Sequence, residues 1–385
     1  MFDVAAHPSS FASDNYAPAH PEVLAAVAAA SAGHVPAYGA DPWTARLRET
    51  VRAELGEHAV VHPVLNGTGA NVVGLMSVLP RWGAVITSEH AHVHVDENGA
   101  PERVGGLKLL PHAAPDGRLG PDVVDAHVGD LGDPHRAQPL AVSITQATEL
   151  GTVYTPEQVR AVADRAHAHG LRLHVDGARI ANAAAALGVS LRELTTDAGV
   201  DVLSFGGTKN GLLIGEAVIV LHQDAAQDAG LGPRTGADQG ATGIEHVRKM
   251  TMQLASKMRY VSAQLLALFE PDDAGEPLWR RNARGANAMA SRLRAALDDA
   301  DGLTFTQATE ANALFAVLPR TAAAALRERF AFYDWGPAPA SAAERLDLPA
   351  TDLVEVRWMC SWDTTPEDVD AFTDAVRTET ARLSR

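Results

Sequence analysis

Short apolar runs alternate with stretches of helical periodicity between about residue 60 and residue 221. The runs that predict strands lie at 60–65, 84–87, 107–110, 140–145, 171–175, 202–205 and 217–221. The stretches that predict helices lie at 71–79, 156–168 and 180–187. This alternation is typical of a mostly parallel sheet with helices on both faces. In such sheets ligands bind at the carboxyl ends of the strands.

Beyond residue 221 the pattern changes to a loop, long helices and a few strands. The predicted elements are a loop at 223–243, one long helix at 245–269, a break at 271–275, a helix to about 300, strands at 314–318 and 353–357, and a helix from 366. We therefore expect an N-terminal arm (1–40) and a large α/β domain (41–244). A long connecting helix and a small α+β domain (245–385) complete the chain.

The net charge of the chain indicates which kinds of binding partner to expect. Asp and Glu total 48 against 32 Lys and Arg, which gives a formal net charge of −16. An acidic surface repels nucleic acid and anionic membranes, so we expect neither as a partner. With 46% hydrophobic residues in 385, the chain can bury the core of more than one domain.

Cysteine usage and the apolar runs indicate the compartment. The single cysteine, Cys360, permits no internal disulfide, which suits a reducing environment. No basic segment followed by an apolar run opens the sequence, so we expect no signal peptide. No apolar stretch approaches the roughly 20 residues that span a bilayer. These features predict a cytoplasmic protein, and most such proteins of this length are enzymes.

A glycine-rich turn, NGTGAN (66–71), lies between a predicted strand and a predicted helix. Glycine lets the backbone approach a ligand closely, and the start of a helix offers N–H groups that suit a phosphate. The turn matches neither the dinucleotide fingerprint nor the Walker loop, because no Lys-Ser/Thr pair follows it. A phosphate site and an ordinary strand–helix turn both remain open here.

Two further motifs follow neighbouring strands, DGAR (176–179) and GGTKNG (206–211). The Asp176 carboxylate can pair with a protonated pyridine nitrogen, which sustains the electron sink of pyridoxal phosphate (PLP). The alternative is a cap for the next helix. Small residues around Lys209 leave room for a planar ring, as a Schiff-base lysine requires. Its alternative is a lysine in a surface turn.

The segment SEHAHVHVDE (88–97) is dense in potential ligands. If it is extended, His90, His92 and His94 share one face, which would suit zinc. The other interpretation is that one histidine stacks flat on a cofactor ring while the others are structural. We favour the second interpretation and expect no metal ion.

These motifs, in this order, resemble the threonine aldolase family of fold-type-I PLP-dependent enzymes, in its low-specificity L-threonine aldolase branch. The similarity runs from SDN (13–15) through YGADP (38–42) to VRWMCSW (356–362), which is nearly the whole chain. It is most specific around Asp176 and Lys209. The resemblance implies a PLP-dependent transferase-like fold with a large domain on a mainly parallel sheet and a small C-terminal domain. It also implies a homodimer or homotetramer with sites at the subunit interface.

The resemblance implies a role for each residue at the cofactor. Lys209 would hold PLP as a Schiff base, and Asp176 would pair with the pyridine nitrogen. Gly67 and Thr68 would bind the phosphate. His92 would stack on the ring, and it or a bound water would act as the base.

The resemblance extends to the substrate and to a second subunit. Arg357 would bind the substrate carboxylate, with Ser13 as a helper, and Arg179 would lie near the ring oxygen and the same carboxylate. Lys249 matches a lysine that reaches a neighbouring subunit's phosphate. One departure is Glu149, which stands where many family members carry a histidine linked to stereochemical preference.

The reaction implied is retro-aldol cleavage of an L-β-hydroxy-α-amino acid to glycine and an aldehyde, a lyase reaction of amino-acid metabolism. L-Threonine, L-allo-threonine and phenylserine-like compounds are the expected substrates. Transamination, β-elimination and racemisation would use the same residues and stay open. A nicotinamide oxidoreductase would need a glycine fingerprint that the sequence lacks, and a non-catalytic scaffold would leave Lys209 without a purpose.

Overall fold

The computed structural model describes residues 10–221 and 243–381, so most of the loop predicted at 223–243 lies outside the described residues. The chain divides into two compact units. The small unit comprises the described residues up to Pro18, Leu150–Thr152 and those from Arg281 onward. The large unit comprises the described residues of Ala19–Glu149 and Val153–Arg280.

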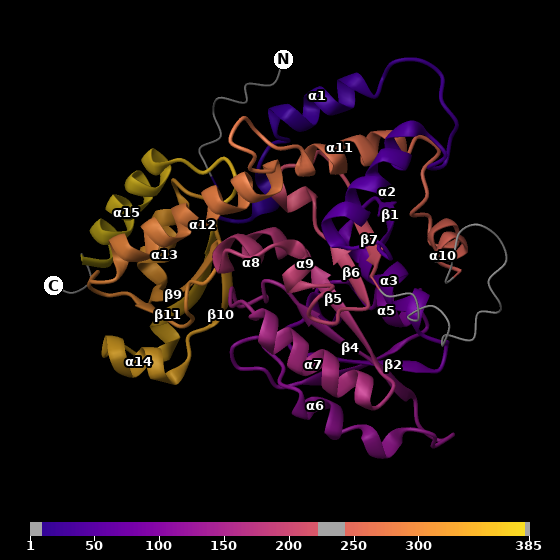
Figure 1. Cartoon of the computed structure of the whole chain (residues 1–385). Coiled ribbons are helices and arrows are strands. Elements are labelled where there is room, and N and C mark those ends of the chain that lie inside the picture. Colours follow the sequence, from indigo (N-terminus) through magenta and orange to yellow (C-terminus); the bar gives the residue numbers. More distant parts are fainter. Residues whose placement is uncertain (1–9, 222–242, 382–385) are drawn as a thin grey trace. The chain divides into compact units, whose positions relative to one another are not determined.

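A seven-stranded sheet forms the centre of the large unit (Figure 1), with the strand order β1-β7-β6-β5-β4-β2-β3. Its strands are β1 (Val60–Val64), β2 (Gly83–Ser88), β3 (Lys108–His112), β4 (Gln138–Thr145), β5 (Arg172–Gly177), β6 (Val202–Phe205) and β7 (Glu216–Val220). The ladders from β3 through β6 are parallel. β7 runs antiparallel to both of its neighbours. The prediction of a mainly parallel sheet is therefore confirmed.

Local sequence signals begin and end the helices around this sheet. Those of the large unit are α1 (Pro21–Ala29), α2 (Pro42–Leu55), α3 (Gly67–Val78), α4 (His92–Val95), α5 (Ala100–Arg103), α6 (Asp122–Asp125), α7 (Pro156–Ala168), α8 (Ile180–Leu187), α9 (Leu191–Leu194), α10 (Ile244–Met250) and α11 (Arg259–Phe269). In α7, Thr155 and Gln158 form a reciprocal capping box, and a proline occupies the first turn. Gly170, with φ of 75°, turns the chain into β5.

Helix α3 packs closely on the sheet because Gly74 has no side chain. A Cβ at Gly74 would lie 3.3 Å from a methyl of Val202 and 3.5 Å from the ring of His174. Successive side chains of a strand point to opposite faces, so His174 and Asp176 both face α3. The fold thus brings the last residues of β5 against the first turns of α3.

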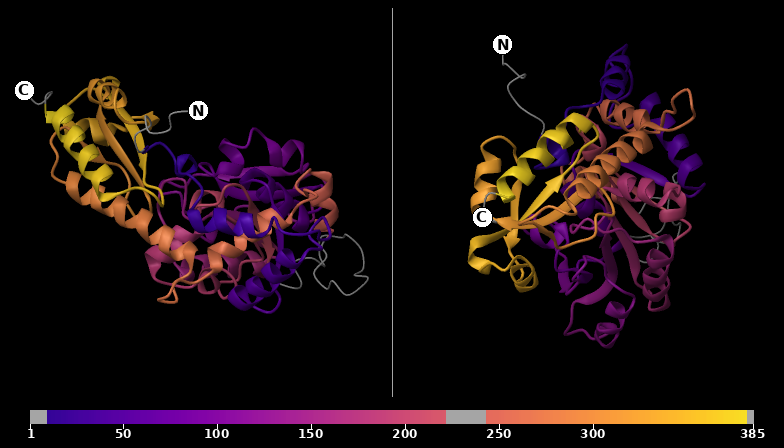
Figure 2. Two further views of the ribbon diagram at one scale, coloured as in Figure 1. Left: turned by 90° about the horizontal axis from the view of Figure 1, so that it is seen from above. Right: turned by 90° about the vertical axis from the view of Figure 1, so that its left-hand side faces the viewer.

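The small unit is built on a four-stranded antiparallel sheet with the order β10-β11-β9-β8. Its elements are η2 (Asp14–Tyr16), α12 (Leu278–Leu297) from Arg281 onward, β8 (Thr304–Phe305), β9 (Ala313–Pro319), α13 (Arg320–Arg327), β10 (Tyr333–Pro337), α14 (Ala340–Leu346), β11 (Leu353–Met359) and α15 (Pro366–Ala381). Alternate residues of β9 and β11 form a core with α12, α13 and α15, which lie together beside the strands in Figure 2. Helix α14 packs against residues of the other face, Val317 and Leu353.

The single helix predicted over 245–269 is wrong, because the structure has two helices, α10 and α11. Met252 adopts a left-handed conformation with φ of 63°, which ends the first helix. The side-chain oxygen of Gln253 then accepts a hydrogen bond from the backbone N–H of Leu65 at 3.0 Å. A long-range contact therefore breaks the helix, and apolar periodicity does not register such a contact.

Two other boundaries differ from the sequence prediction. Helix α3 begins at Gly67, four residues before the predicted start, because the Asn66 side chain accepts from Gly69 N at 2.7 Å and caps it. The expected irregular arm contains α1, with a proline in its first turn and His20 as its cap.

In the part of the chain that the structure describes, no helix is long and apolar enough to cross a membrane.

Candidate active site

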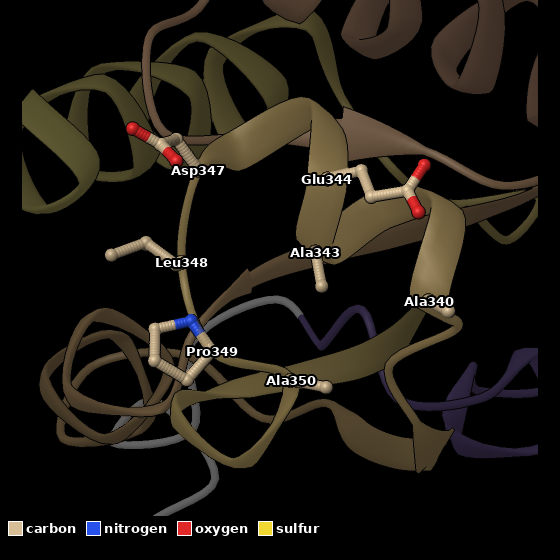
Figure 3. Close-up of a pocket in the computed structure, with 7 residues that line it drawn as sticks. All are labelled: Ala340, Ala343, Glu344, Asp347, Leu348, Pro349 and Ala350. Carbon is tan, nitrogen blue, oxygen red and sulfur yellow. The ribbon is translucent and has the colours of Figure 1, made fainter.

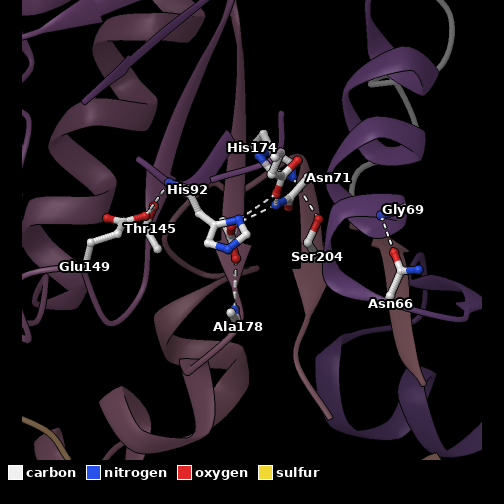
Figure 4. A network of polar contacts seen from close by, with 11 residues as sticks. Asn66, Gly69, Asn71, His92, Thr145, Glu149, His174, Ala178 and Ser204 are labelled. Carbon is white, nitrogen blue, oxygen red and sulfur yellow. Dashed lines mark hydrogen bonds and ion pairs between the residues drawn. The ribbon is translucent and has the colours of Figure 1, made fainter. Parts of the chain in front are cut away.

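Three polar side chains meet where the carboxyl end of β5 faces α3 (Figure 4). The side-chain amide of Asn71 donates to Asp176 Oδ2 and to Glu97 Oε1, both at 2.8 Å. Asp176 Oδ1 accepts from the backbone N–H of Ala178 at 3.0 Å. Asp176 is 5% exposed. Helix α8 has Arg179 as its N-cap and no side-chain cap, so the alternative of a helix-capping Asp176 is wrong.

His92 begins α4 and joins the same network. Its Nδ1 lies 3.0 Å from Glu97 Oε1, and its side chain is 40% exposed. The hydrogen bond with Glu97 raises the pKa of His92, and the Asp176 charge adds to the rise, while burial and the Lys209 charge oppose it. His92 and His94 lie in a helix, so the extended arrangement needed for the zinc hypothesis is not present. Within the described residues, no group of three or more His, Cys, Asp or Glu is arranged to hold a metal ion.

Glu149 supports His92 from the other side. Its Oε1 accepts the backbone N–H of His92 at 2.8 Å and the hydroxyl of Thr145 at 2.9 Å. Its Oε2 is buried without a hydrogen bond. Burial raises the pKa of Glu149 to about 7, and the nearby Asp176 charge contributes. Glu149 therefore holds a proton more readily than an ordinary carboxylate does.

Lys209 follows β6 in the short 3-10 helix η4 (Thr208–Asn210) and is half-buried. The preceding glycines are required by packing. A Cβ on Gly206 would lie 2.4 Å from the carbonyl oxygen of Ala178, and one on Gly207 would lie 2.4 Å from the Leu212 side chain. This loop therefore packs directly against the residues that follow Asp176. The charges of Lys209 and Asp176 both act on the pKa of His92. Lys209, Asp176 and His92 therefore belong to one site.

The glycine-rich turn begins α3 at the same edge of the sheet. A Cβ built on Gly67 meets no atom within 4 Å, so open space adjoins the first turn of the helix. Thr68 is half-buried there. A helix start leaves N–H groups without intrahelical partners, and these suit an anion. The side chain of Gln253 packs against Gly69 and closes the other side of the turn.

A buried hydrogen-bond chain fixes the strand that carries Asp176. His174 Nδ1 lies 2.9 Å from the hydroxyl of Ser143, and Nε2 lies 3.0 Å from that of Ser204. Burial lowers the pKa of His174 to about 4, so its ring is neutral at pH 7. These bonds tie β4, β5 and β6 together beneath the site.

Two predicted substrate residues meet within the small unit. A guanidinium nitrogen of Arg357, Nη2, donates to the carbonyl oxygen of Ala12 at 3.2 Å, next to Ser13. The guanidinium carbon lies 4.9 Å from the centre of the Trp335 ring. Ser13 is buried, and its hydroxyl accepts from Asn15 N at 3.2 Å.

The remaining predicted residues lie on two other helices of the large unit. Arg179 is half-buried at the start of α8, and its N–H bonds the carbonyl of Gln146 at 3.3 Å. Lys249 lies exposed on α10, with its ammonium 4.9 Å from the centre of the Tyr38 ring.

Sequence reasoning missed two groups that complete the site, Asn71 and Glu216. Asn71 joins Asp176 to Glu97, and its signal is an amide side chain that directly precedes the apolar run of helix α3. Glu216 is a buried carboxyl at the start of β7, and its side chain accepts the N–H of Gly207. Its signal is a charge that opens an apolar strand.

The small unit also has a surface hollow, shown in Figure 3. Its lining residues are Ala340, Ala343, Glu344, Asp347, Leu348, Pro349 and Ala350. Two carboxylates and no cation line it, which does not suit a phosphate or an amino-acid carboxylate.

Comparisons with known proteins found a matching family, relatives that cover nearly the whole chain, and a similar solved structure. The beta-eliminating lyase family matches residues 10–321 of the chain. The low specificity L-threonine aldolase of Pseudomonas aeruginosa is 39% identical over 374 residues, which cover 96% of this chain and 98% of the relative. The enzyme of the same description from a Pseudomonas species is 38% identical over 356 residues, with coverage of 92% and 93%. The structure of Leishmania major threonine aldolase aligns with a TM-score of 0.84 at 26% identity, covering 97% of this chain and 100% of that one.

Proposed function

The chain belongs to the beta-eliminating lyase family, in its low-specificity L-threonine aldolase group, and we propose that it cleaves L-β-hydroxy-α-amino acids to glycine and an aldehyde. A threonine aldolase is an aldehyde-lyase that breaks the Cα–Cβ bond of its substrate. The observation that carries the proposal is the buried Asp176, held by Asn71 and Ala178 N–H beside the Lys209 loop.

The family is PLP-dependent, and the residues present fit that group. Open space beside Gly67 adjoins the helix start that would receive the phosphate. Asp176 is a buried carboxylate with both oxygens bonded, as the partner of a pyridinium nitrogen should be. Lys209 would hold the cofactor covalently. Bound PLP supplies the electron sink that receives the electrons of the breaking bond.

The chain's own residues would orient and deprotonate the substrate. Arg357, with a guanidinium flanked by aromatic rings, would bind the substrate carboxylate and so fix which bond at Cα breaks. His92 would lie over the cofactor ring, and its Nε2 could take the β-hydroxyl proton directly or through a water. Glu149 would hold the backbone of His92 in place.

Five further residues complete the proposed roles. Gly67 and Thr68 would bind the phosphate through the start of α3, and Lys249 would reach the phosphate of a second copy. Arg179 would lie near the ring oxygen, and Ser13 would assist Arg357 from the adjoining backbone. A homodimer or homotetramer is therefore part of the proposal.

The test is to incubate the purified protein with PLP and a panel of L-β-hydroxy-α-amino acids, and to measure glycine and aldehyde in equal amounts. L-Threonine, L-allo-threonine and L-phenylserine form the panel, and D-threonine is the control. Release of ammonia and an α-keto acid without glycine would mean a different lyase reaction. A protein that forms neither product would contradict the proposed function.

A further inference from the structure

Glu216 is a buried carboxyl group that the mechanism above does not use. It opens β7 opposite Val64 of β1, and the whole strand is buried. Glu216 is 8% exposed. Acidic side chains are seldom buried to this degree unless other groups pair with them. Its partners therefore indicate why the chain keeps a carboxyl group there.

The partners of Glu216 belong to the segment that carries Lys209. Its Oε2 accepts the backbone N–H of Gly207. Thr208 and the charge of Lys209 both lower the pKa of this carboxyl, which shows that they lie close to it. The hydroxyl of Thr208 further lies 3.3 Å from the carbonyl oxygen of Gly215. Of the two residues that precede Lys209, Gly207 is thus bonded to the Glu216 side chain and Thr208 to the backbone of the residue before Glu216.

The other side of the same segment is closed by packing. Gly206 lies so close to Ala178 that a Cβ would come within 2.4 Å of its carbonyl oxygen. The N–H of Gly206 donates to Gly177 O at 3.0 Å. The segment is therefore clamped between the residues after Asp176 and the carboxyl of Glu216. A hydrogen bond to an ionised acceptor is about twice as strong as one between neutral groups.

We infer that Glu216 is a positioning residue for Lys209: its carboxylate holds the backbone of Gly207, and it places a negative charge near Lys209 Nζ. The inference deepens the proposed function, because it rests on Lys209 being the residue that binds the cofactor. A fixed loop sets the direction in which the Lys209 side chain leaves the backbone. The nearby negative charge favours the protonated form of Nζ.

Burial raises the pKa of Glu216 to about 7, while the bond from Gly207, the nearby Thr208 and the charge of Lys209 lower it. The carboxyl therefore titrates close to neutral pH. His92 is another titratable group whose pKa responds to the charge of Lys209, and the charge of Asp176 acts on the same histidine. Asp176 and His92 are not among the groups that shift the pKa of Glu216, so variants at Glu216 report on the effect of that one group.

The experiment measures the near-visible absorbance of the PLP-loaded protein against pH, which reports the proton on Lys209 Nζ, together with kcat and KM. Glu216→Gln keeps the shape and an acceptor oxygen but removes the charge. In this variant the pH midpoint of the absorbance change should fall by on the order of one pH unit, because the protonated form of Lys209 Nζ loses a stabilising charge. We expect kcat to fall roughly tenfold and KM to change by less than about twofold.

Two further variants keep the test decisive. Thr208→Val leaves the carboxyl in place and removes a hydroxyl that lowers its pKa, so it should lower the midpoint by a smaller amount even if Glu216→Gln folds poorly. Glu355→Gln is the matched control, because Glu355 is another partly buried carboxyl whose pKa is raised by burial and which bonds a threonine hydroxyl, that of Thr306. It should leave the midpoint at the wild-type value.

The outcomes separate this inference from the proposed function. Borohydride reduction of the wild-type protein followed by peptide mapping identifies the lysine that holds PLP. A label away from Lys209 overturns the proposed function and this inference together. A label on Lys209, with wild-type midpoint and kcat in Glu216→Gln and in Thr208→Val, overturns only the positioning role.

Discussion

At the scale of single residues, Asp176 is the best-defined group of the site. Its two oxygens have separate donors, one on α3 and one in its own turn, so the carboxylate has a single orientation. Its charge also contributes to the raised pKa values of His92 and Glu149. A change at this position therefore alters the electrostatics of the whole site.

We predict that Asp176→Asn keeps PLP bound and loses most turnover. The amide cannot hold a proton on the pyridine nitrogen, so the electron sink is weakened. Loss of a hydrogen bond to a charged group of about 1.5–3 kcal/mol corresponds to roughly tenfold to a hundredfold in kcat. The measurement is kcat with the bound PLP quantified on the same sample. Normal turnover would mean that Asp176 is structural.

Arg357→Ala should lower kcat/KM for β-hydroxy-α-amino acids by on the order of tenfold to several thousandfold, because truncating one partner of a buried charge pair costs about 2–5 kcal/mol. Arg357→Lys should recover little, since an ammonium cannot replace the planar fork. The absorbance of bound PLP should stay unchanged. Wild-type cleavage by Arg357→Ala would exclude the carboxylate-binding role.

Glu149→Gln should make the protein more stable at pH 8 than wild type, and the gain should disappear near pH 4. A carboxyl whose folded-state pKa lies at about 7 binds its proton more tightly than in the unfolded chain, so wild-type stability falls as pH rises from about 4.5 to about 7. At about 1.4 kcal/mol per pH unit, the difference is on the order of a few kcal/mol. Urea unfolding at both pH values measures it, and a pH-independent difference would contradict it.

At the scale of elements, most strands and helices follow from the sequence. The buried parallel strands are near-continuous apolar runs, and the bounds of α7, α8 and β6 coincide with their predicted ranges. The break between α10 and α11 could not be predicted, because a tertiary hydrogen bond from Leu65 to Gln253 produces it. The same reason applies to Asn71 and Glu216, whose partners are set by the packing of α3 and the register of β7 rather than by local pattern.

The left-handed residue in that break gives a prediction about stability. Met252→Gly should raise the free energy of unfolding by up to about 1 kcal/mol, because the φ of 63° costs a side chain about 1–2 kcal/mol and glycine loses part of this as backbone entropy. Met250→Gly is the matched control. Met250 is also exposed but ends helix α10, so glycine should destabilise the protein there. Denaturant midpoints compare the two, and a destabilising Met252→Gly would contradict the prediction.

At the scale of the whole molecule, three exposed apolar side chains near Lys249 are the basis for predicting a surface that binds a second copy of the chain. Tyr38, Met250 and Met252 are 54%, 65% and 77% exposed. Tyr38 also lies under the ammonium of Lys249, and its N–H bonds Ser256 O at 2.8 Å. Apolar side chains gathered on a rigid surface are typical of protein–protein interfaces.

We therefore predict that the active protein is at least a dimer and that Met252→Asp weakens the assembly. Sedimentation velocity over a dilution series, with activity measured on each sample, tests this. Trp82→Asp is the control, because Trp82 is 66% exposed on a different segment and should leave the assembly unchanged. A fully active monomer would contradict the prediction.

The antiparallel direction of β7 has a consequence for how the chain folds. β6 and β7 are joined only by residues 206–215. The parallel strands β5 and β6, by contrast, are joined by a longer connection that contains helices. Closing a short loop costs little chain entropy, so local pairings form early in folding. The hairpin that holds Lys209 between Gly207 and Glu216 is thus expected to form before β5 brings Asp176 beside it. The amide protons of the β6–β7 hairpin should therefore acquire protection from exchange before those of β5.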